Sequence, residues 1–374
     1  MDRKELLGEV ERIVIKVGTT TITKGSSAVS EDMIDSIAEQ VKKLKDQRKE
    51  VLIVTSGAIG IGLKVMGVKP NPNDIPIRQA ASSVGQSILM QKWNESFQKQ
   101  GMIVAQILLT MDIYSDRDSV LNLNNTIDSL LKHNVVPIFN ENDAVSIKEI
   151  GAVFGDNDTL SAMIASRVDA DLLIIMSDVD GLYDKNPSIH KDAKFISVVE
   201  EITSEIKEMA GDPVSGMGTG GMKTKIRAAE ICKDAGCRMI IVSSAVDDAV
   251  LKSVCGEDVG TIFISDTQIS KKRRWTKSAK SQGAIEIDEG AAKAIYEHQS
   301  LLPIGILHVG GQFSKGEVVD IVCNKNMIAK GISNYSSEDI QKIMGLHSSK
   351  INEILGRKDH RDAVYSQNIV LLFD

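Results

Sequence analysis

The sequence predicts a three-layer α/β sandwich with a mostly parallel central sheet, followed by a small β-rich domain. Three observations support this: short β-branched runs alternate with helical patterns, the runs are continuously apolar, and short strands with glycine turns follow a polar stretch. Continuous apolar strands separated by amphipathic helices are typical of a parallel sheet covered on both faces. The expected buried strands are Arg12–Val17, Val51–Thr55, Met102–Leu109, Val135–Phe139, Leu172–Met176 and Met239–Val242.

Three segments are expected along the chain. Residues 1–264 would form the α/β domain, residues 265–282 a polar linker with basic residues at 271–274, and residues 283–374 the β-rich domain. Many short strands within about 100 residues indicate a small, partly closed barrel. Its expected strands are Ala284–Ile287, Ile304–Val309, Glu317–Val322, Met327–Ser333 and Ile369–Phe373.

The composition favours a folded protein that acts on small molecules. Of the 374 residues, 42% are hydrophobic and 25% charged, and the net charge of -7 argues against a protein that coats nucleic acid. The four cysteines form no C-x-x-C pair, which disfavours a zinc knuckle or a disulfide framework and fits a reducing compartment. No apolar run is long enough to span a bilayer, so we expect a cytoplasmic protein without membrane contact.

The run Gly216–Lys225 is the first candidate phosphate-binding segment. It contains G-x-G-x-x-G, but an acidic helical pattern precedes it where a dinucleotide site needs a strand, and Met222 interrupts its match to a Walker A loop. Both motifs are therefore excluded. What remains is a glycine-rich approach to a helix start near Met222, with Lys223 and Lys225 adding positive charge. The alternative is a surface loop with solvated lysines.

Further polar residues follow the predicted strands. Lys16, Ser56, the segment 140–143 and the pair Ser177–Asp178 stand at carboxyl ends of strands, and a second acidic and amide cluster occupies 155–158. Ligands of open parallel sheets bind beyond these ends, so the clusters are expected to form one composite site. Taken singly, Lys16 is equally explained as a solvated lysine, Ser56 also fits an ordinary helix cap, and each acid or amide is better explained as part of an Asx turn or cap.

Histidine and protein-held metal are not expected in this site. None of the six histidines stands near these clusters with a Cys or Ser partner, and no H-E-x-x-H or comparable ligand spacing occurs.

Seven motifs together resemble the amino acid kinase family in order and spacing, from about Glu11 to Phe263. They are IKVGTT, VTSGAIGIG, RQAASSVGQ, FNENDAVS, FGDNDTLSA, SDVDGLY and GTGGMKTK. The tail resembles a PUA domain through IEIDEGAAKAI, SLLPIGI, FSKGEVVDI and AKGISNYSS. The resemblance implies the amino acid kinase fold with a PUA-like barrel. Two departures are Ser177, where threonine is more usual, and the segment TKSA after Trp275.

Within this family the motifs are most similar to those of members that phosphorylate the side-chain carboxylate of L-glutamate with ATP. That reaction gives L-glutamyl 5-phosphate and is the first step of proline biosynthesis. Kinases of aspartate or N-acetylglutamate remain as alternatives. An RNA-binding protein that uses the PUA-like domain is a further alternative, although 15 Lys and Arg against 13 Asp and Glu from Ser265 onward make a thin basic excess.

The resemblance also implies which residues contact ATP. Lys16 and Lys225 would touch the phosphoryl oxygens, and Asp158 would organise the two lysines, so these three are the implied catalytic residues. The magnesium ion would be held mainly by the ATP phosphates. The implied ATP-binding residues are Lys16, Ser177, Asp178, Thr219, Gly220, Gly221, Met222, Lys223, Thr224 and Lys225.

Ser56, Asp143 and Asn157 would hold glutamate by the same resemblance. The side-chain carboxyl of glutamate, with an ordinary pKa near about 4.3, is already ionised at neutral pH and needs no general base. Catalysis must instead offset the repulsion between this carboxylate and the γ-phosphoryl group, which cations and glycine N–H groups can do. Asp158 would then orient the lysines and would not abstract a proton.

The resemblance implies several partners besides L-glutamate and ATP. The family suggests a homodimer or homotetramer and feedback inhibition by proline. Because an acyl phosphate is labile, transfer of the product to a glutamyl phosphate reductase is a reasonable hypothesis. RNA binding stays open.

Overall fold

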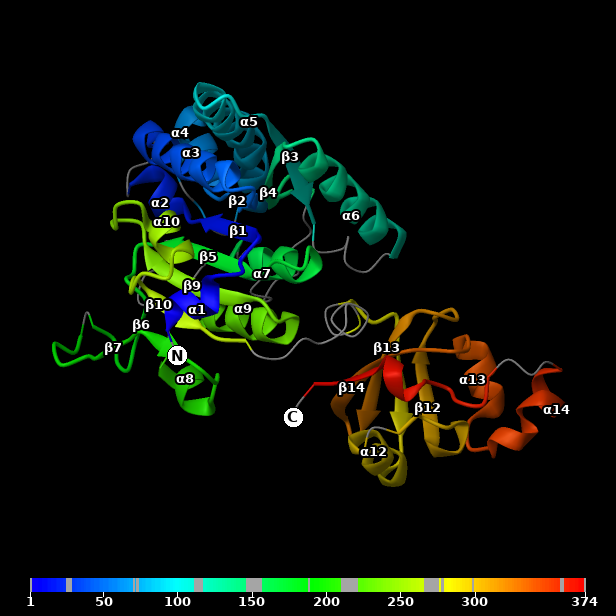
Figure 1. Ribbon diagram of the computed structural model, residues 1–374. Helices are drawn as coiled ribbons and strands as arrows, with labels where there is room; N and C mark the ends of the chain where they lie inside the picture. The colour runs from blue at the N-terminus through cyan, green and yellow to red at the C-terminus, as the bar shows by residue number, and fades with distance from the viewer. Residues whose placement is uncertain are drawn as a thin grey trace. The chain divides into compact units, whose positions relative to one another are not determined.

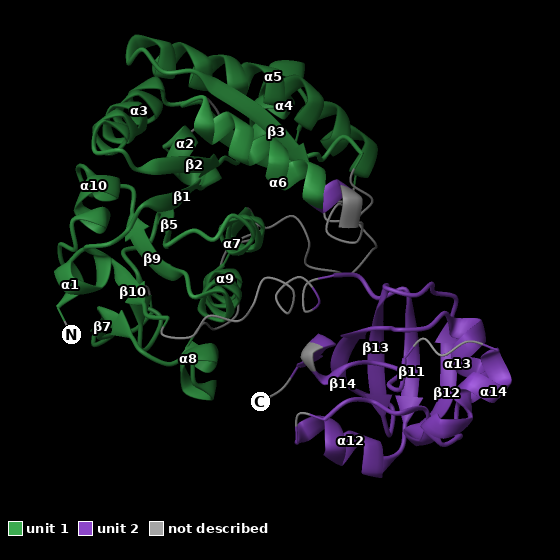
Figure 2. Cartoon of the chain, turned by 45° about the vertical axis from the view of Figure 1, so that its right-hand side comes forward, with its two compact units in different colours: residues 1–111, 121–268 green, residues 112–120, 269–374 purple. Residues whose placement is uncertain are grey.

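The computed structural model describes residues 2–24, 29–69, 71, 74–110, 117–145, 157–187, 189–209, 221–265, 276, 279–297, 299–356 and 360–372. The chain divides into two compact units, the first of residues 1–111 and 121–268 and the second of residues 112–120 and 269–374 (Figure 2). Each unit has its own hydrophobic core.

The first unit is built around one twisted sheet. Within the described residues, eight strands are ordered β3-β4-β2-β1-β5-β9-β10-β8, and all neighbours are parallel except β9 and β10. The bounds are β1 (Arg12–Val17), β2 (Glu50–Val54), β3 (Val104–Leu109), β4 (Val136–Glu141), β5 (Leu172–Ser177), β8 (Val198–Val199), β9 (Arg238–Ser243) and β10 (Thr261–Phe263). The predicted mostly parallel sheet is confirmed.

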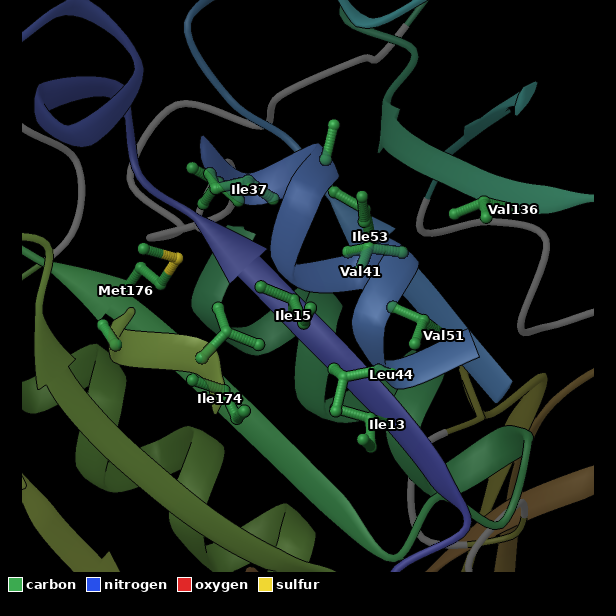
Figure 3. Packing of buried hydrophobic residues seen from close by; sticks show 14 of the residues in the cluster. Ile13, Ile15, Ile37, Val41, Leu44, Val51, Ile53, Val136, Ile174 and Met176 are labelled. Atoms are coloured by element: carbon green, nitrogen blue, oxygen red, sulfur yellow. The ribbon is translucent and has the colours of Figure 1, made fainter. Parts of the chain in front are cut away.

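Helices cover both faces of this sheet and complete the three layers (Figures 1 and 2). On one face lie α3 (Glu31–Asp46), α5 (Ile75–Lys99) and α10 (Ala249–Val254), whose buried side chains share one apolar cluster with the strands. Figure 3 shows Ile37, Val41 and Leu44 of α3 packed over Ile13 and Ile15 of β1. The other face is covered by α7 (Asn157–Arg167) and α9 (Met222–Ala235), which pack on each other and on the central strands.

The alternation of side chains along β1 decides where its lysine lies. Ile13, Ile15 and Val17 belong to the cluster under α3, and successive side chains of a strand point to opposite faces. Lys16 therefore faces α7 and α9 from the penultimate position of a strand that is buried almost throughout.

Two helices on the first face approach at backbone distance. A Cβ added at Gly62 of α4 (Ala58–Met66) would lie 1.7 Å from the carbonyl oxygen of Ala81, and one added at Gly85 of α5 would lie 1.9 Å from that of Ala58. No side chain larger than hydrogen fits at either position, so these glycines permit the close contact of α4 with α5.

One burial prediction for the sheet was wrong, and four short strands were not predicted. Most side chains of β3 are partly or fully exposed because β3 is an edge strand of the sheet. The strands β8 and β10, together with β6 (Leu182–Tyr183) and β7 (Phe195–Ile196) of a separate hairpin, are only two or three residues long. The remaining helices are α1 (Arg3–Leu7), α2 (Thr19–Thr23), α6 (Arg117–Lys132) and α8 (Ser204–Met209).

The second unit contains a five-stranded sheet in its described part, ordered β12-β11-β13-β14-β15. Its strands are β11 (Gly283–Ile287), β12 (Ile306–Gly311), β13 (Val318–Cys323), β14 (Asn326–Ile332) and β15 (Ile369–Leu371), and its helices are α12 (Glu289–Tyr296), α13 (Ser337–Ile343) and α14 (Ile351–Leu355). The predicted β-rich C-terminal fold is thereby confirmed. The basic residues 271–274 lie outside the described residues. None of the described helices is both long and apolar enough to cross a membrane.

Candidate active site

A buried carboxylate between two lysines is the central feature of the site. Asp158 is 0% exposed, its Oδ1 lies 2.6 Å from Nζ of Lys16, and its Oδ2 lies 3.1 Å from Nζ of Lys225. Burial alone would raise the pKa of Asp158, but the charges and hydrogen bonds of the two lysines outweigh it and hold this pKa well below its ordinary value. The ionised cluster has a net charge of one positive unit, which favours an anion beside it.

Three elements bring this cluster together. Lys16 comes from the end of β1, Asp158 from the first turn of α7 and Lys225 from the first turn of α9. A carboxylate in the first turn of a helix is stabilised by the helix dipole. The packing of α7 on α9 places these two helix starts together. The lysines are 8% and 6% exposed, so the cluster opens only narrowly to solvent.

The start of α9 adds backbone donors to the same place. Its N-cap residue Gly221 has an extended backbone (φ -119°, ψ -172°), and no side chain among the described residues caps the first turn. The first N–H groups of a helix lack intrahelical acceptors and favour an anion. The predicted helix start at Met222 is thus confirmed. Thr219 and Gly220 of the same predicted segment lie outside the described residues.

Thr224 links this helix start to the buried carboxylate. Its Oγ1 lies 3.0 Å from Oδ2 of Asp158 and 2.7 Å from the carbonyl oxygen of Gly221. A hydroxyl carries one hydrogen, so it donates to one of these two acceptors at a time. Met222 is partly buried and Lys223 is exposed.

A second cluster, made of amides and hydroxyls, lies next to the first in sequence and in space. Asn157 directly precedes Asp158, and its Nδ2 lies 2.8 Å from Oγ of Ser56, 2.7 Å from the carbonyl oxygen of Thr55 and 3.0 Å from Oδ1 of Asn140. The ends of β2 and β4 and the start of α7 therefore meet at Asn157, which brings together two of the three predicted glutamate-binding residues.

The third of these residues, Asp143, accepts from helix α5, which contains the motif RQAASSVGQ. Oγ of Ser82 in α5 donates to Oδ2 of Asp143 at 3.2 Å, and Asn140 Nδ2 donates to Oε1 of Gln86, one turn further along α5, at 2.8 Å. Ser82, Gln86 and Asn140 are all buried. Sequence reasoning assigned none of these three an individual role. The only available signal was the presence of two polar residues four apart in RQAASSVGQ, a stretch of otherwise mostly small residues.

The predicted nucleotide-side residues Ser177 and Asp178 follow β5, which neighbours β1 in the sheet. Ser177 is buried, Asp178 is exposed, and the Ser177 hydroxyl donates to Asp178 Oδ1 at 3.1 Å. Because β1 and β5 run parallel, with Val17 opposite Met176, this pair lies at the same edge of the sheet as Lys16.

The described residues contain no group of three or more His, Cys, Asp or Glu side chains that could hold a metal ion. The one carboxylate in the lysine cluster, Asp158, is bound on both oxygens by lysines.

Comparison with known proteins agrees with this fold. Residues 11–243 match the model of the amino acid kinase family, and residues 283–355 match that of the PUA domain. The chain belongs to the amino acid kinase family.

Relatives that match the chain over nearly all of its residues show its place within that family. It is 49% identical to a glutamate 5-kinase of Methanosarcina barkeri, with 99% of each chain covered, and 42% identical to one of Caldanaerobacter subterraneus subsp. tengcongensis, with 96% of this chain and 98% of the relative covered. It groups with the glutamate 5-kinases, as the motif resemblance predicted. Among solved structures, an isopentenyl phosphate kinase aligns with 68% of this chain and 100% of its own, at a TM-score of 0.48 and 19% identity.

Proposed function

We propose that this chain transfers the γ-phosphoryl group of ATP to the side-chain carboxylate of L-glutamate. The product is L-glutamyl 5-phosphate, the first intermediate of proline biosynthesis. The observation that supports this most directly is the buried Lys16–Asp158–Lys225 cluster, which lies between the start of α9 and a hydrogen-bonded cluster of amides and hydroxyls.

Lys16 and Lys225 are proposed to stabilise the phosphoryl group in the transition state of its transfer. Charge spreads over the phosphoryl oxygens in the transition state, and preorganised cations in a poorly solvated site stabilise it more than water does. Asp158 fixes the two Nζ atoms on opposite oxygens of one carboxylate. Because its pKa is held below the ordinary value, Asp158 stays ionised, and it orients the lysines without abstracting a proton.

The nucleotide is proposed to lie along the start of α9 and the end of β5. Gly221, Met222, Lys223 and Thr224 would face its phosphates with the help of Thr219 and Gly220, while Ser177 and Asp178 would lie on its nucleoside side. The uncapped first turn of α9 and the absence of a side chain at Gly221 fit an anion of this size.

Mg²⁺ is proposed to be held mainly by the ATP phosphates. It prefers oxygen ligands and usually keeps several waters, so substrate phosphates commonly provide much of its coordination. When bound, it neutralises phosphate charge. Engagement of Asp158 by both lysines fits this arrangement better than a cage of protein carboxylates.

Glutamate is proposed to bind at Ser56, Asn157 and Asp143. The Ser56 hydroxyl accepts from Asn157 and keeps its own hydrogen, and the backbone N–H of Asn157 stands in the first turn of α7, where N–H groups lack intrahelical acceptors, so both suit a carboxylate. The carboxylate of Asp143 suits the ammonium group. Since Ser56 is bonded to Asn157 and Asp158 is the next residue in the chain, a side-chain carboxylate bound at Ser56 and Asn157 would face the two lysines.

Product analysis with a substrate panel tests the proposal. ADP release is measured with L-glutamate, L-aspartate and N-acetyl-L-glutamate, and hydroxylamine is added to trap the acyl phosphate as a hydroxamate. We expect kcat/KM for glutamate to exceed the others by about 100-fold, as for a site that rejects ligands which leave its polar groups unpaired. ADP release without hydroxamate, or a preference for another acid, would contradict it.

The remaining partners are proposed on the same basis. Proline shares the α-carboxylate and ammonium of glutamate and is proposed to compete for the site at Asp143, which inhibition kinetics against glutamate would test.

The labile product is proposed to pass to a glutamyl phosphate reductase, which should protect it from hydrolysis in a coupled assay. A homodimer or homotetramer is proposed, and light scattering gives its mass.

A further inference from the structure

Helix α5 places two buried polar side chains beside the proposed glutamate site. Ser82 is 4% and Gln86 8% exposed, and residues four apart lie on the same face of a helix. Ser82 donates to Asp143, while Gln86 accepts from Asn140. Gln86 has a second polar atom, Nε2, which takes no part in the bond to Asn140.

The orientation of the neighbouring amides follows from backbone groups. The backbone N–H of Glu141, which can only donate, lies 2.9 Å from the Asn140 side chain, so the atom facing it is Oδ1. Oδ1 also accepts from Asn157, whose Nδ2 is fixed by the carbonyl oxygen of Thr55. The Nδ2 of Asn140 must then point at Gln86.

Gln86 consequently presents its oxygen to Asn140 and turns its nitrogen away. This Nε2, with two hydrogens, is buried and has no partner among the described residues. Buried donors are nearly always paired in native proteins, and an unpaired one is destabilising until an acceptor arrives. The missing partner is an acceptor, and a carboxylate oxygen is the strongest one that the proposed substrate offers.

We propose that Gln86 is a specificity-determining residue that donates from Nε2 to the α-carboxylate of the bound amino acid. This inference rests on the proposed function. The side-chain carboxylate must face Lys16 and Lys225, which leaves the α-carboxylate for the opposite end. The α-carboxylate shares a carbon with the ammonium group assigned to Asp143, and Asp143 is bonded to Ser82, about 6 Å along α5 from Gln86.

Two substitutions separate donation to substrate from support of Asn140. Gln86→Glu keeps the shape and the oxygen that Asn140 needs but removes the N–H donor, whereas Gln86→Met removes both. For Gln86→Glu we expect the KM for glutamate to rise about tenfold or more at pH 8.5, with the KM for ATP unchanged. The effect should be smaller at pH 6.5, because burial raises the pKa of a carboxyl group and its protonated form can still donate.

A substrate analogue identifies the carboxylate concerned. L-Isoglutamine carries a carboxamide in place of the α-carboxylate and can donate to the introduced carboxylate, so its affinity, measured as Ki against glutamate, should fall less in Gln86→Glu than that of glutamate. The matched control is Gln98→Glu, the same change at an exposed position of α5, which should leave every constant unchanged.

Specific results would overturn the inference. A KM within about twofold of wild type in Gln86→Glu at pH 8.5, with a rise only in Gln86→Met, would show that Gln86 merely supports Asn140. Equal losses for glutamate and isoglutamine would exclude the α-carboxylate. A wild-type protein that phosphorylates another acidic amino acid overturns the proposed function alone, and the same comparison is then made with that substrate and its α-amide.

Discussion

Replacement of Lys225 by methionine tests the proposal that Lys225 stabilises the transition state and does not bind glutamate. The side chain of methionine has similar length and volume, so the start of α9 keeps its packing while Nζ is lost. Asp158 keeps its 2.6 Å ion pair with Lys16 and therefore remains a paired, buried carboxylate. The net charge of the cluster falls from one positive unit to zero.

The expected loss is in turnover. Removal of one preorganised group that stabilises transition-state charge typically lowers kcat by about 10²- to 10³-fold, or about 2.7–4 kcal/mol of activation free energy. Since Lys225 pairs with Asp158, whereas the proposed glutamate-binding residue Ser56 is bonded to Asn157, the KM for glutamate should change by less than about threefold. Steady-state ADP release with varied glutamate at saturating ATP measures both constants.

Lys233→Met is the control, because Lys233 lies two turns further along α9, away from the cluster. It should have the kinetics of wild type. Turnover of Lys225→Met within about threefold of wild type would refute the assigned role. A large rise in the KM for glutamate at normal kcat would refute it as well, since it would place Lys225 on the acceptor.

Three further predictions concern other parts of the first unit. Asp143→Ala should raise the KM for glutamate more than tenfold at nearly unchanged KM for ATP, as expected for loss of a charged partner of the substrate ammonium. Gly85→Ala should lower the free energy of unfolding, measured in urea, by about 2–3 kcal/mol or prevent folding, because its Cβ would lie 1.9 Å from the carbonyl oxygen of Ala58. The depressed pKa of Asp158 means that the unfolded state binds the proton more tightly, so stability from this group is present above about pH 4 and is lost as pH falls toward the folded value. The stability advantage of wild type over Asp158→Asn in thermal unfolding should therefore shrink between pH 5 and about pH 3.

Each prediction has a result that contradicts it. An unchanged KM for glutamate in Asp143→Ala would remove that residue from the substrate pocket. Wild-type stability of Gly85→Ala, compared with Gly60→Ala, where nothing lies within 4 Å of the added Cβ, would refute the close contact of the two helices. A stability difference for Asp158→Asn that is constant from pH 5 to about pH 3 would mean that its carboxyl titrates alike in both states.

The strands of both sheets were largely predictable because of their composition. β1 has the predicted bounds, and β2, β4, β5 and β9 begin or end within two residues of theirs, since each is a continuous run of mainly apolar side chains. The edge position of β3 could not be predicted, because an apolar run does not reveal how many neighbours a strand has. Strands of two or three residues, such as β8 and β10, are too short to show a period. The predicted domain boundaries stay a prediction.

The parts of the candidate site that lie at strand ends, and at the helix starts of α7 and α9, could be proposed from the sequence. Lys16, Ser56 and Ser177 stand directly at or after β-branched runs, and parallel topology then brings their loops to one edge. Ser82 and Gln86 belong to the quoted motif RQAASSVGQ but received no individual role, because they lie within a 25-residue helix, and helical spacing alone does not tell a buried polar side chain from a solvated one. Their roles emerge only from the tertiary contacts with Asp143 and Asn140.

The backbone contact between α4 and α5 fixes the spacing of two helices beside the proposed glutamate site. Ser56 stands two residues before α4, while Ser82 and Gln86 belong to α5, and the crossing at Gly62 and Gly85 leaves no space between the two helices. The two helices therefore pack as one rigid body, which holds the proposed glutamate-binding side chains at a fixed spacing. Redesign of the enzyme for a longer or shorter acceptor substrate would therefore have to change side chains of α4 and α5, because the distance between these two helices cannot be adjusted.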